Sequence, residues 1–267
     1  MAGRHGRLEM NGEPHVLVVA GSDSSGGAGI VRDIETIAAH GLRACVAVTA
    51  VTVQTHREAG AVEIMPPSLV AAQMRAALAA NDVRAVKIGM LGMARMVSEI
   101  ASVLRARPDL PVVLDPVLVT SSGGRLLDED GTAALKQELL PLCRLVTPNW
   151  LELAVLAGRP AARGPGQAIE QAGQLLANGR GAVLVKAGHA PLERAGDMLV
   201  FRDRPPVHFD APRLDAAMRG SGCMLSSAVA ANLAGGFTLE DAVRAAKARV
   251  FAALWENVRP TSTAPGS

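Results

Sequence analysis

Two glycines, a serine and a cysteine occupy positions 220–223 and lead directly into an apolar run with helical character. Such a sequence gathers unpaired backbone N–H groups at the positive end of a helix dipole, where phosphate oxygens commonly bind. A thiol at a helix N-terminus has its thiolate stabilised, so Cys223 is predicted to act as a base or nucleophile near neutral pH. An anion site that contains a proton acceptor suggests phosphoryl transfer. The alternative is a glycine turn capped by Ser221, with Cys223 as a small buried residue.

Other polar residues follow apolar runs that are typical of buried strands. Asp115 comes directly after residues 112–114, while Asn149 and Glu152 have the spacing that places them on one helix face. One amide and two carboxylates could hold Mg²⁺ through waters, as this cation prefers. Lys186, at another strand end, could meet nucleotide phosphates as a point charge. The alternatives are a helix N-cap for Asn149 and a solvated lysine at position 186.

A loop rich in glycine and serine occupies residues 21–29 after the first apolar run. It has neither the Gly-Lys-Ser/Thr ending of a P-loop nor the spacing of a dinucleotide fingerprint. Its glycines still allow a ligand to approach the backbone closely. Asp33 follows one helical turn later, with a solvated helix face as its alternative environment. Gln54 could give a bidentate amide contact to a heterocycle, or be a polar loop residue.

Strands and helices that position these residues alternate along almost the whole chain. Apolar strands are predicted at residues 15–20, 44–53, 85–88, 111–114, 145–147 and 182–186, with a hairpin near 198–209. Helices are predicted at residues 28–40, 68–80, around 96–104, 128–139, 149–156, 167–177, 222–234 and 239–258. Repeated β-α-β units imply a mainly parallel sheet covered on both faces by helices. Ligands of such sheets bind outside the carboxyl ends of the strands.

The composition excludes several classes of function. The chain has 267 residues and is 49% hydrophobic, but it contains only four phenylalanines, two tryptophans and no tyrosine. Scarce aromatic residues argue against single-stranded nucleic-acid binding. The net charge of +2 comes from dispersed residues, so neither DNA nor an anionic membrane is implied as a partner.

The three cysteines, Cys45, Cys143 and Cys223, form no C-x-x-C pair, which favours a reducing, cytoplasmic location. No run of residues is apolar for long enough to span a bilayer. One domain is predicted over residues 14–259, with flexible segments at residues 1–13 and 260–267.

Six short motifs occur in a fixed order along the chain. They are AGSDSSGGAGI at 20–30, KIGML at 87–91, LDPV at 114–117, TPN at 147–149, VKAGH at 185–189 and GSGC at 220–223. Together they resemble the hydroxymethylpyrimidine/phosphomethylpyrimidine kinases of thiamine biosynthesis, within the ribokinase-like superfamily, over about residues 14–255. The resemblance implies a three-layer ribokinase-like α/β fold and phosphorylation of the pyrimidine half of thiamine, with ATP as co-substrate and Mg²⁺. It also leads us to expect a homodimer.

The resemblance also implies roles for individual residues. Cys223 matches the position at which sugar kinases carry a catalytic aspartate, so it would take the proton from the attacking oxygen. The backbone N–H groups of Gly220, Ser221 and Gly222 would stabilise charge on the transferring phosphoryl group. The residues that match the family's pyrimidine pocket are Gln54, which reads the aminopyrimidine edge, and Gly21, Asp33, Met90 and Val117.

On the phosphate side, Asn149 and Glu152 match an Asn-x-x-Glu motif near magnesium, and Asp115 and Lys186 lie in further motifs. The chain departs from the family in two places.

The family usually has Thr-His before the glycine loop, where this chain has Met218-Arg219, and a lysine is missing from the loop at 120–123. Arg219 could supply charge for a substrate that is already phosphorylated. We therefore expect a kinase that acts on hydroxymethylpyrimidine phosphate and on the free alcohol. A pyridoxal-type kinase and a catalytically silent vitamin-binding or regulatory protein are the alternatives.

Overall fold

The computed structural model describes residues 13–55, 59–118, 126–177, 181–187, 196–210, 212 and 218–258. The terminal segments predicted to be flexible lie almost wholly outside these residues, as do the loop at 120–123 and the pair Gly188-His189.

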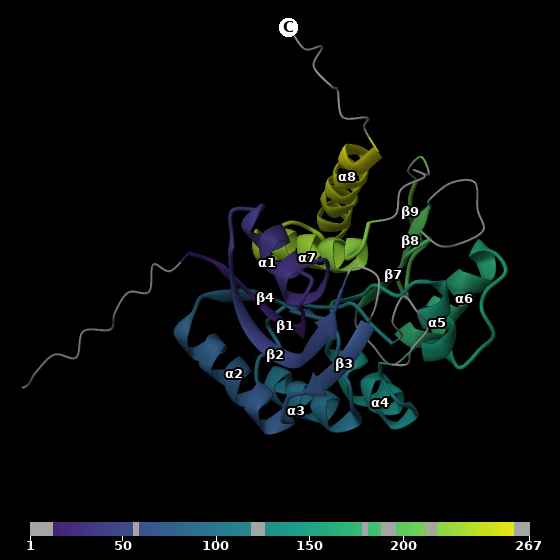
Figure 1. The fold of residues 1–267 in the computed structure, drawn as a ribbon. Coiled ribbons are helices and arrows are strands. Elements are labelled where there is room, and N and C mark those ends of the chain that lie inside the picture. The colour runs from purple at the N-terminus through teal and green to yellow at the C-terminus, as the bar shows by residue number, and fades with distance from the viewer. Residues whose placement is uncertain are drawn as a thin grey trace, which may run out of the picture.

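The described strands form one nine-stranded sheet in the order β3-β2-β1-β4-β5-β6-β7-β8-β9 (Figure 1). These strands are β1 (His15–Asp23), β2 (Arg43–Gln54), β3 (Ala59–Ile64), β4 (Val83–Ile88), β5 (Val112–Leu114), β6 (Leu145–Val146), β7 (Ala182–Val185), β8 (Asp197–Val200) and β9 (Val207–Phe209). The six central strands, in the order β2-β1-β4-β5-β6-β7, pair in parallel with their neighbours. Strands β3, β8 and β9 each join antiparallel to a neighbour. The predicted parallel sheet and the hairpin near its end are confirmed.

Helices cover both faces of this sheet. They are α1 (Gly29–Ala38), α2 (Pro67–Ala80), α3 (Ala94–Arg105), α4 (Glu129–Ala134), α5 (Trp150–Ala157), α6 (Pro165–Leu176), α7 (Ser221–Ala234) and α8 (Leu239–Val258). The helix predicted at 128–139 is shorter than expected, because α4 continues as a π-helical turn (Leu135–Leu139) and a 3₁₀ turn (Leu140–Leu142).

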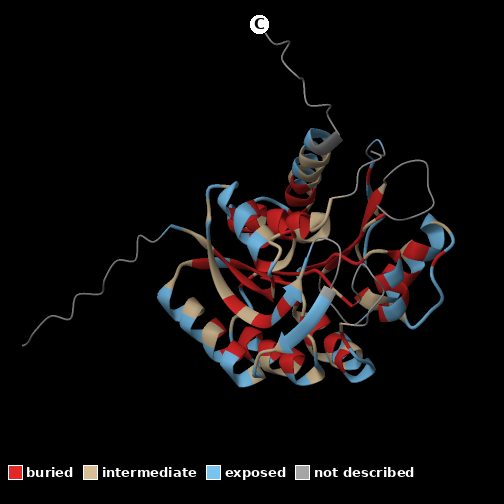
Figure 2. Cartoon of the chain, viewed as in Figure 1, coloured by how far each residue is buried: buried red, intermediate tan, exposed pale blue. Residues whose placement is uncertain are grey.

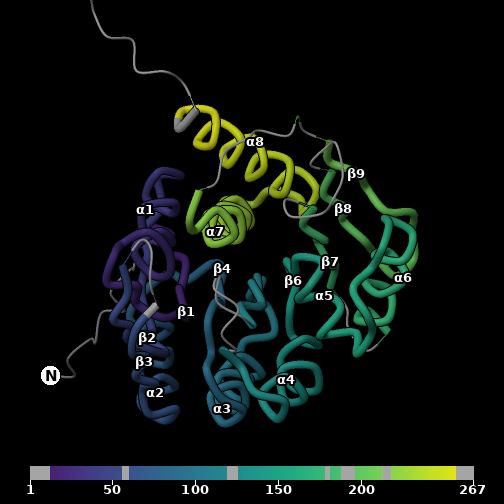
Figure 3. Tube along the Cα trace, turned by 45° about the vertical axis from the view of Figure 1, so that its right-hand side comes forward, coloured from purple at the N-terminus to yellow at the C-terminus, as the bar shows by residue number. Residues whose placement is uncertain are grey.

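Alternation along each strand divides the core into two layers. Val16 and Val18 pack with α1, α7 and α8 in one apolar cluster, and Leu17 and Val19 pack in another with α2 and α3. Figure 3 shows α7 and α8 on one side of the sheet and α2, α3 and α4 on the other. The three-layer arrangement therefore follows from the two-residue period of the strands.

Helix α7 is buried along most of its length (Figure 2). Its sequence is small and apolar on every side, as expected of a helix enclosed by other elements. It packs between α1, α8 and the sheet, so its N-terminus is held firmly at the sheet's edge. No helix in the described part of the chain is both long and apolar enough to cross a membrane.

Two strand predictions need correction. Strand β3 was not predicted, because Gly60 and Glu63 interrupt its short apolar pattern, and pairing with β2 supplies what local propensity lacks. Strand β1 does not end at Ala20 but continues to Asp23, with a register shift between Ala20 and Gly21. This extension carries the start of the glycine loop to the carboxyl edge of the sheet.

Candidate active site

The first turn of α7 is fixed against the glycine loop that follows β1. Gly220, the N-cap of α7, has a φ of +75°, a left-handed conformation that L-residues with side chains rarely adopt. A Cβ at this position would lie 2.4 Å from the carbonyl oxygen of Gly27. Glycine is therefore required both for the turn and for the close approach of the two loops.

The free N–H groups of this turn are fewer than predicted. The N–H of Met224 donates to the Gly220 carbonyl at 2.8 Å, which begins the helix, and that of Ser221 donates to the Met218 carbonyl at 3.3 Å. The N–H groups of Gly222 and Cys223 lie in the first turn, where a helix supplies no carbonyl partner. Ser221 was predicted to donate to a phosphoryl group, but in this conformation its N–H is already used by the turn.

The cradle formed by this turn faces a charged cluster on the neighbouring strand ends. A Cβ built on Gly222 would lie 3.4 Å from Lys186 Nζ and 3.5 Å from Asp115 Oδ2. Lys186 Nζ donates to Asp115 Oδ1 at 2.8 Å and lies 4.0 Å from Glu152 Oε2. The predicted phosphate-binding and metal-binding residues are thus brought together beside the N-terminus of α7.

Burial and mutual charge set the ionisation of this cluster. Burial acts to raise the pKa of Asp115, but the ammonium groups of Lys186 and Lys87 and the hydroxyl of Thr147 hold it below its ordinary value. Burial raises the pKa of Glu152 to about 7; Asp115 adds to this rise, and Lys186 opposes it. Although burial disfavours its ammonium form, Asp115 and Glu152 raise the pKa of Lys186. The solvated alternative for Lys186 is therefore wrong.

Asn149 is the N-cap of α5, which was the alternative interpretation of this residue. Its side-chain oxygen accepts hydrogen bonds at 2.9 Å from the N–H groups of Leu151 and Glu152, and Glu152 Oε2 accepts from the N–H of Asn149 at 2.8 Å. This capping box begins α5 and fixes the carboxylate of Glu152 toward Lys186. Asn149 keeps only its amide NH₂ group for a ligand.

The donor set fits Mg²⁺ that is held through waters and phosphate oxygens rather than in a cage of protein ligands. Within the described residues, no group of three or more His, Cys, Asp or Glu side chains could hold a metal ion. Asp115 and Glu152 supply two carboxylates beside the Lys186 ammonium group, and two carboxylates are typical of magnesium sites that share phosphate ligands.

The residues predicted for the pyrimidine pocket lie near the ends of neighbouring strands on the same edge, or rim, of the sheet. A Cβ on Gly21 would lie 3.3 Å from Met90 Sδ, so these two residues are neighbours. Gln54 ends β2, where Ser24 Oγ bridges its backbone N–H and carbonyl at 2.8 Å each. Its side-chain oxygen accepts a hydrogen bond from Thr52 Oγ1 at 3.2 Å. The half-buried Val117 follows Asp115 after β5.

The order of these residues along the rim follows the order of the strands. Gln54 ends β2, Gly21 lies near the end of β1, and Met90 and Val117 follow β4 and β5; these four strands are successive neighbours in the sheet. Asp115, Asn149, Glu152 and Lys186 follow β5, β6 and β7, which continue the same order. The rim thus has one half that carries the residues predicted for the pyrimidine pocket and one charged half. The start of α7 meets the charged half at Gly222 and the glycine loop at Gly220.

Asp33 lies deeper than predicted. It is completely buried; Oδ2 accepts from Lys87 Nζ at 2.7 Å, and Oδ1 accepts from Ser227 Oγ at 2.7 Å. Burial raises the pKa of Asp33, against the opposing effects of Lys87 and Ser227. The solvated alternative is wrong, and both oxygens of Asp33 are engaged within the protein. Lys87 was given no role from the sequence, although a lysine in a buried strand before Gly89 was a signal.

The predicted ionisation of Cys223 is wrong for this state of the protein. Burial raises the pKa of its thiol to about 11; Lys87 opposes the rise, and the carboxylates of Asp33 and Asp115 reinforce it. The backbone N–H of Gly29 also favours the thiolate. Burial therefore outweighs the favourable effects of Lys87 and the Gly29 N–H, and at neutral pH the group is a thiol.

Arg219 is engaged by two partners within the protein. One guanidinium nitrogen lies 3.0 Å from Asp23 Oδ2, and another donates to the carbonyl of Thr55. Arg219, which precedes the N-cap of α7, thus connects the start of this helix to the ends of β1 and β2, next to Gln54.

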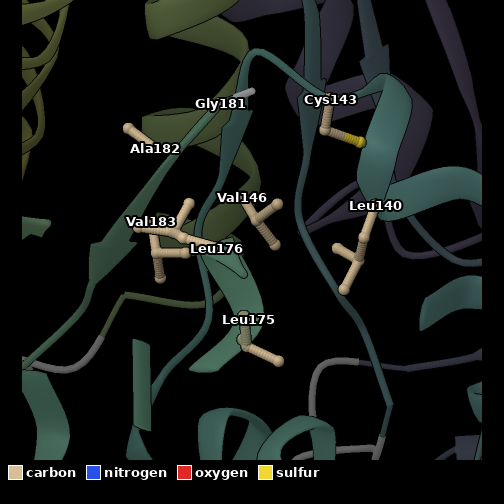
Figure 4. A pocket seen from close by; sticks show the side chains of 8 residues that line it. All are labelled: Leu140, Cys143, Val146, Leu175, Leu176, Gly181, Ala182 and Val183. Atoms are coloured by element: carbon tan, nitrogen blue, oxygen red, sulfur yellow. The ribbon is translucent and has the colours of Figure 1, made fainter. Parts of the chain in front are cut away.

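A small apolar cavity of about 10 Å³ lies elsewhere, between α6 and the start of β7. Figure 4 shows its lining by Cys143, Val146, Leu176 and neighbouring apolar residues. Gly181 and Ala182 place it at the amino end of β7, opposite the edge that carries the charged cluster. It is a packing void of roughly the size of one water molecule.

Comparison with known proteins agrees with this geometry. The family model described as phosphomethylpyrimidine kinase matches residues 23–265. The chain belongs to this family. It is 44% identical over 239 residues to a hydroxymethylpyrimidine/phosphomethylpyrimidine kinase of Rhizobium meliloti (strain 1021), which covers 89% of each chain.

Solved structures of the family and of a related vitamin kinase have the same fold. A phosphomethylpyrimidine kinase from Clostridium difficile 630 has a TM-score of 0.78 and 32% identity, over 90% of this chain and 99% of that one. A pyridoxal kinase from Staphylococcus aureus in complex with AMP-PCP has a TM-score of 0.82 and 27% identity, over 94% and 91%. The predicted ribokinase-like α/β fold is confirmed.

Proposed function

We propose that this protein transfers the γ-phosphoryl group of ATP to 4-amino-5-hydroxymethyl-2-methylpyrimidine and to its monophosphate, in thiamine biosynthesis. Membership of the phosphomethylpyrimidine kinase family and the names of its relatives support this function. The observation that carries it is the order of residues along the rim, with the residues predicted for the pyrimidine pocket in one half and the charged residues in the other. A phosphoryl donor and an acceptor alcohol bound in these halves would meet at Cys223.

The acceptor end requires hydrogen bonds to an aminopyrimidine and a flat space beside the ring. Gln54 supplies an amide with both a donor and an acceptor, and Thr52 and Ser24 hold it in place. Glycine at position 21 lets the sulfur of Met90 approach the backbone closely, because a Cβ there would lie 3.3 Å from it. These features support a planar heterocycle as the acceptor. Asp33, whose oxygens are occupied, supports the pocket from behind.

The phosphate end requires positive charge and N–H donors. Lys186 provides an ammonium group, and the N–H groups of Gly222 and Cys223 lie on the positive end of the α7 dipole. Asp115 and Glu152 would hold Mg²⁺ through waters, and the cation would neutralise charge that develops on the phosphates. The NH₂ group of Asn149 remains free for a phosphate oxygen or a water.

With the free alcohol as acceptor, the proton of its hydroxymethyl group passes to Cys223 Sγ; with the monophosphate, the attacking oxygen belongs to its phosphate group, and any proton on that oxygen passes to the same sulfur. As it leaves, the oxygen forms a bond to the γ-phosphorus, the bond between that phosphorus and its bridging oxygen breaks, and ADP departs. Because the pKa of the Cys223 thiol is about 11 in the free protein, the reactive thiolate becomes more abundant as pH rises. We therefore expect kcat/KM to increase with pH above neutrality.

Arg219 is proposed to favour the monophosphate over the free alcohol. Its guanidinium lies between the pyrimidine half and the glycine loop, paired with Asp23. A substrate phosphate could exchange with that carboxylate, because arginine binds phosphate through paired donors. Arg219→His should then narrow the ratio of kcat/KM between monophosphate and alcohol. An unchanged ratio would remove Arg219 from substrate selection.

A homodimer in the cytoplasm completes the proposal. Val51 and Val53 on β2 are 47% and 68% exposed, close to the sheet edge formed by β3, where a second chain could pack. Sedimentation velocity should give twice the chain mass, and Val53→Lys should shift it toward the monomer. A monomeric wild type at micromolar concentration would contradict the dimer.

The cytoplasmic location is supported by the three unpaired cysteines, which are typical of a reducing compartment.

The function is tested by ADP release in a coupled assay, with the alcohol, the monophosphate and pyridoxal as separate acceptors. Both pyrimidines should support turnover with higher kcat/KM than pyridoxal. Pyridoxal is included because pyridoxal kinases have closely similar folds. Turnover with pyridoxal alone would reassign the protein to that activity, and release of ADP without any acceptor would argue against a kinase.

A further inference from the structure

A second charged group lies behind Cys223, separate from the Asp115–Lys186 pair. Lys87 on β4 is completely buried, and its ammonium group pairs with the equally buried Asp33 at 2.7 Å. Burying two charges is costly, and such a pair is often no more stabilising than apolar residues of the same volume. A role other than stability would explain why the pair is placed here.

Helices α1 and α7 face each other at two successive levels around this pair. At the first level the backbone N–H of Gly29 favours the thiolate of Cys223, and at the second Ser227 Oγ donates to Asp33 at 2.7 Å. Gly29 and Asp33 are four residues apart on α1, as are Cys223 and Ser227 on α7, so each pair shares one helix face. Lys87 reaches the same face from the sheet.

Charges from three directions act on the sulfur of Cys223. Lys87 on β4 favours the thiolate, whereas Asp33 on α1 and Asp115 after β5 disfavour it. Cys223 and Lys186, which follows β7, also interact electrostatically. Of the charged groups that act on the sulfur, Lys87 has the largest effect in favour of the thiolate. It is also fully enclosed, so solvent screens it little.

We propose that Lys87 is a positioning residue for the kinase reaction, whose buried ammonium group, held in place by Asp33 and Ser227, supplies the positive charge that lets Cys223 accept the acceptor's proton. This proposal rests on the proposed function of the site. Lys87 acts through Cys223 and through the α1–α7 contact, and it need not touch the substrate. Asp33 has the opposite electrostatic effect on the sulfur but fixes the position of the ammonium.

The test compares two charge-removing variants by the alkylation of individual cysteines. Full-length wild type, Lys87→Met and Asp33→Asn are treated with iodoacetamide between pH 7 and pH 10, and each cysteine is followed by mass spectrometry. Alkylation of Cys223 should slow in Lys87→Met and accelerate in Asp33→Asn, by about tenfold for each unit of displacement of the pKa. Cys45 is the internal control, because burial also raises the pKa of its thiol to about 11.

Opposite directions of change separate an electrostatic role from a structural one. A general loosening of the site would expose Cys223 and accelerate its alkylation in both variants. That result, or an unchanged rate relative to Cys45 in both, would overturn the proposal. Ser227→Ala removes a hydrogen bond to Asp33 without changing any charge, and it should alter Cys223 much less than either charge variant.

The double variant Lys87→Met/Asp33→Asn keeps the test decisive if a lone buried charge prevents folding. Removing both groups leaves no uncompensated ion, and the loss of Lys87 should still slow alkylation of Cys223, though less than in Lys87→Met. The pH profile of kcat should move to higher pH in this variant, while KM for ATP stays near wild type. Because alkylation needs no substrate, an inactive wild type would refute the proposed function without deciding the role of Lys87. A double variant whose Cys223 reacts like wild type would refute that role.

Discussion

Replacement of Gly220 by alanine would force apart the two glycine loops that meet at the start of α7. The new Cβ would lie 2.4 Å from the Gly27 carbonyl oxygen, about 1 Å short of ordinary contact at 3.4 Å. In addition, alanine in the left-handed conformation costs about 1–2 kcal/mol. The first turn of α7 carries Gly222 and Cys223, so a shift of this size displaces the proposed phosphate donors. A misplacement of about 1 Å at a reacting centre costs roughly 100-fold in rate.

Gly41→Ala is the matched control for this variant. Gly41 has a φ of +72°, close to the +75° of Gly220, but no atom lies within 4 Å of a Cβ built there. Both variants should lose a few degrees of melting temperature from backbone strain, at about 2–4 °C for each kcal/mol in a chain of this size. Only Gly220→Ala should lose kcat/KM for ATP by about 100-fold.

Melting curves and steady-state kinetics on the same preparations distinguish displacement of the phosphate site from backbone strain alone. If Gly220→Ala retains kcat/KM within threefold of Gly41→Ala, the contact between the loops does not position the phosphate site. If Gly41→Ala loses activity to the same extent, strain alone explains the effect, and the geometric argument fails.

Three further substitutions test separate parts of the site. Cys223→Ala should lower kcat by about 10²–10⁴-fold with little effect on ATP binding, because it removes the proton acceptor. Gln54→Leu should weaken binding of the pyrimidine by about 1–3 kcal/mol in titration calorimetry, since substrate polar groups are left unpaired. Glu152→Gln should unfold at a higher temperature than wild type at pH 8, and the difference should vanish toward pH 5. The raised pKa of about 7 means that wild-type stability is full below the ordinary value of 4.5 and falls by about 3 kcal/mol as pH rises through 7.

Each of these expectations has a contrary result. Near-normal kcat in Cys223→Ala would leave the thiol with a structural role only; Cys45→Ala, which removes another partly buried thiol, is its control. Equal losses of ATP and pyrimidine binding in Gln54→Leu would contradict its assignment to the heterocycle. A stability difference in Glu152→Gln that does not change with pH would show that this carboxylate is not strained by burial.

Most elements could be predicted because they follow from local periodicity. The helix at 239–258 and the hairpin near 198–209 are found where the apolar pattern placed them. Asp115 could be placed at a strand end because an uninterrupted apolar run stops directly before it. Strand β3 could not, since it depends on pairing with β2 rather than on its own residues.

The electrostatics of the site could not be read from the sequence, because they depend on contacts between distant segments. Asp33 and Lys87 are 54 residues apart, and Asp115 and Lys186 are 71 apart, yet each pair lies within hydrogen-bonding distance. The raised pKa of Cys223 follows from burial, to which the carboxylates of Asp33 and Asp115 add. A sequence pattern places a residue on an element, but it does not show which charges that element is packed against.

Phosphorus-31 NMR of the reaction with the pyrimidine monophosphate tests the central claim most directly. The account predicts that ATP is consumed while ADP and a second pair of coupled phosphorus resonances appear, as expected for a pyrimidine diphosphate. The same enzyme with the free alcohol should first give a single phosphomonoester resonance. Conversion of ATP to ADP and inorganic phosphate, with the pyrimidine monophosphate unchanged, would contradict the claim that this protein is a pyrimidine kinase.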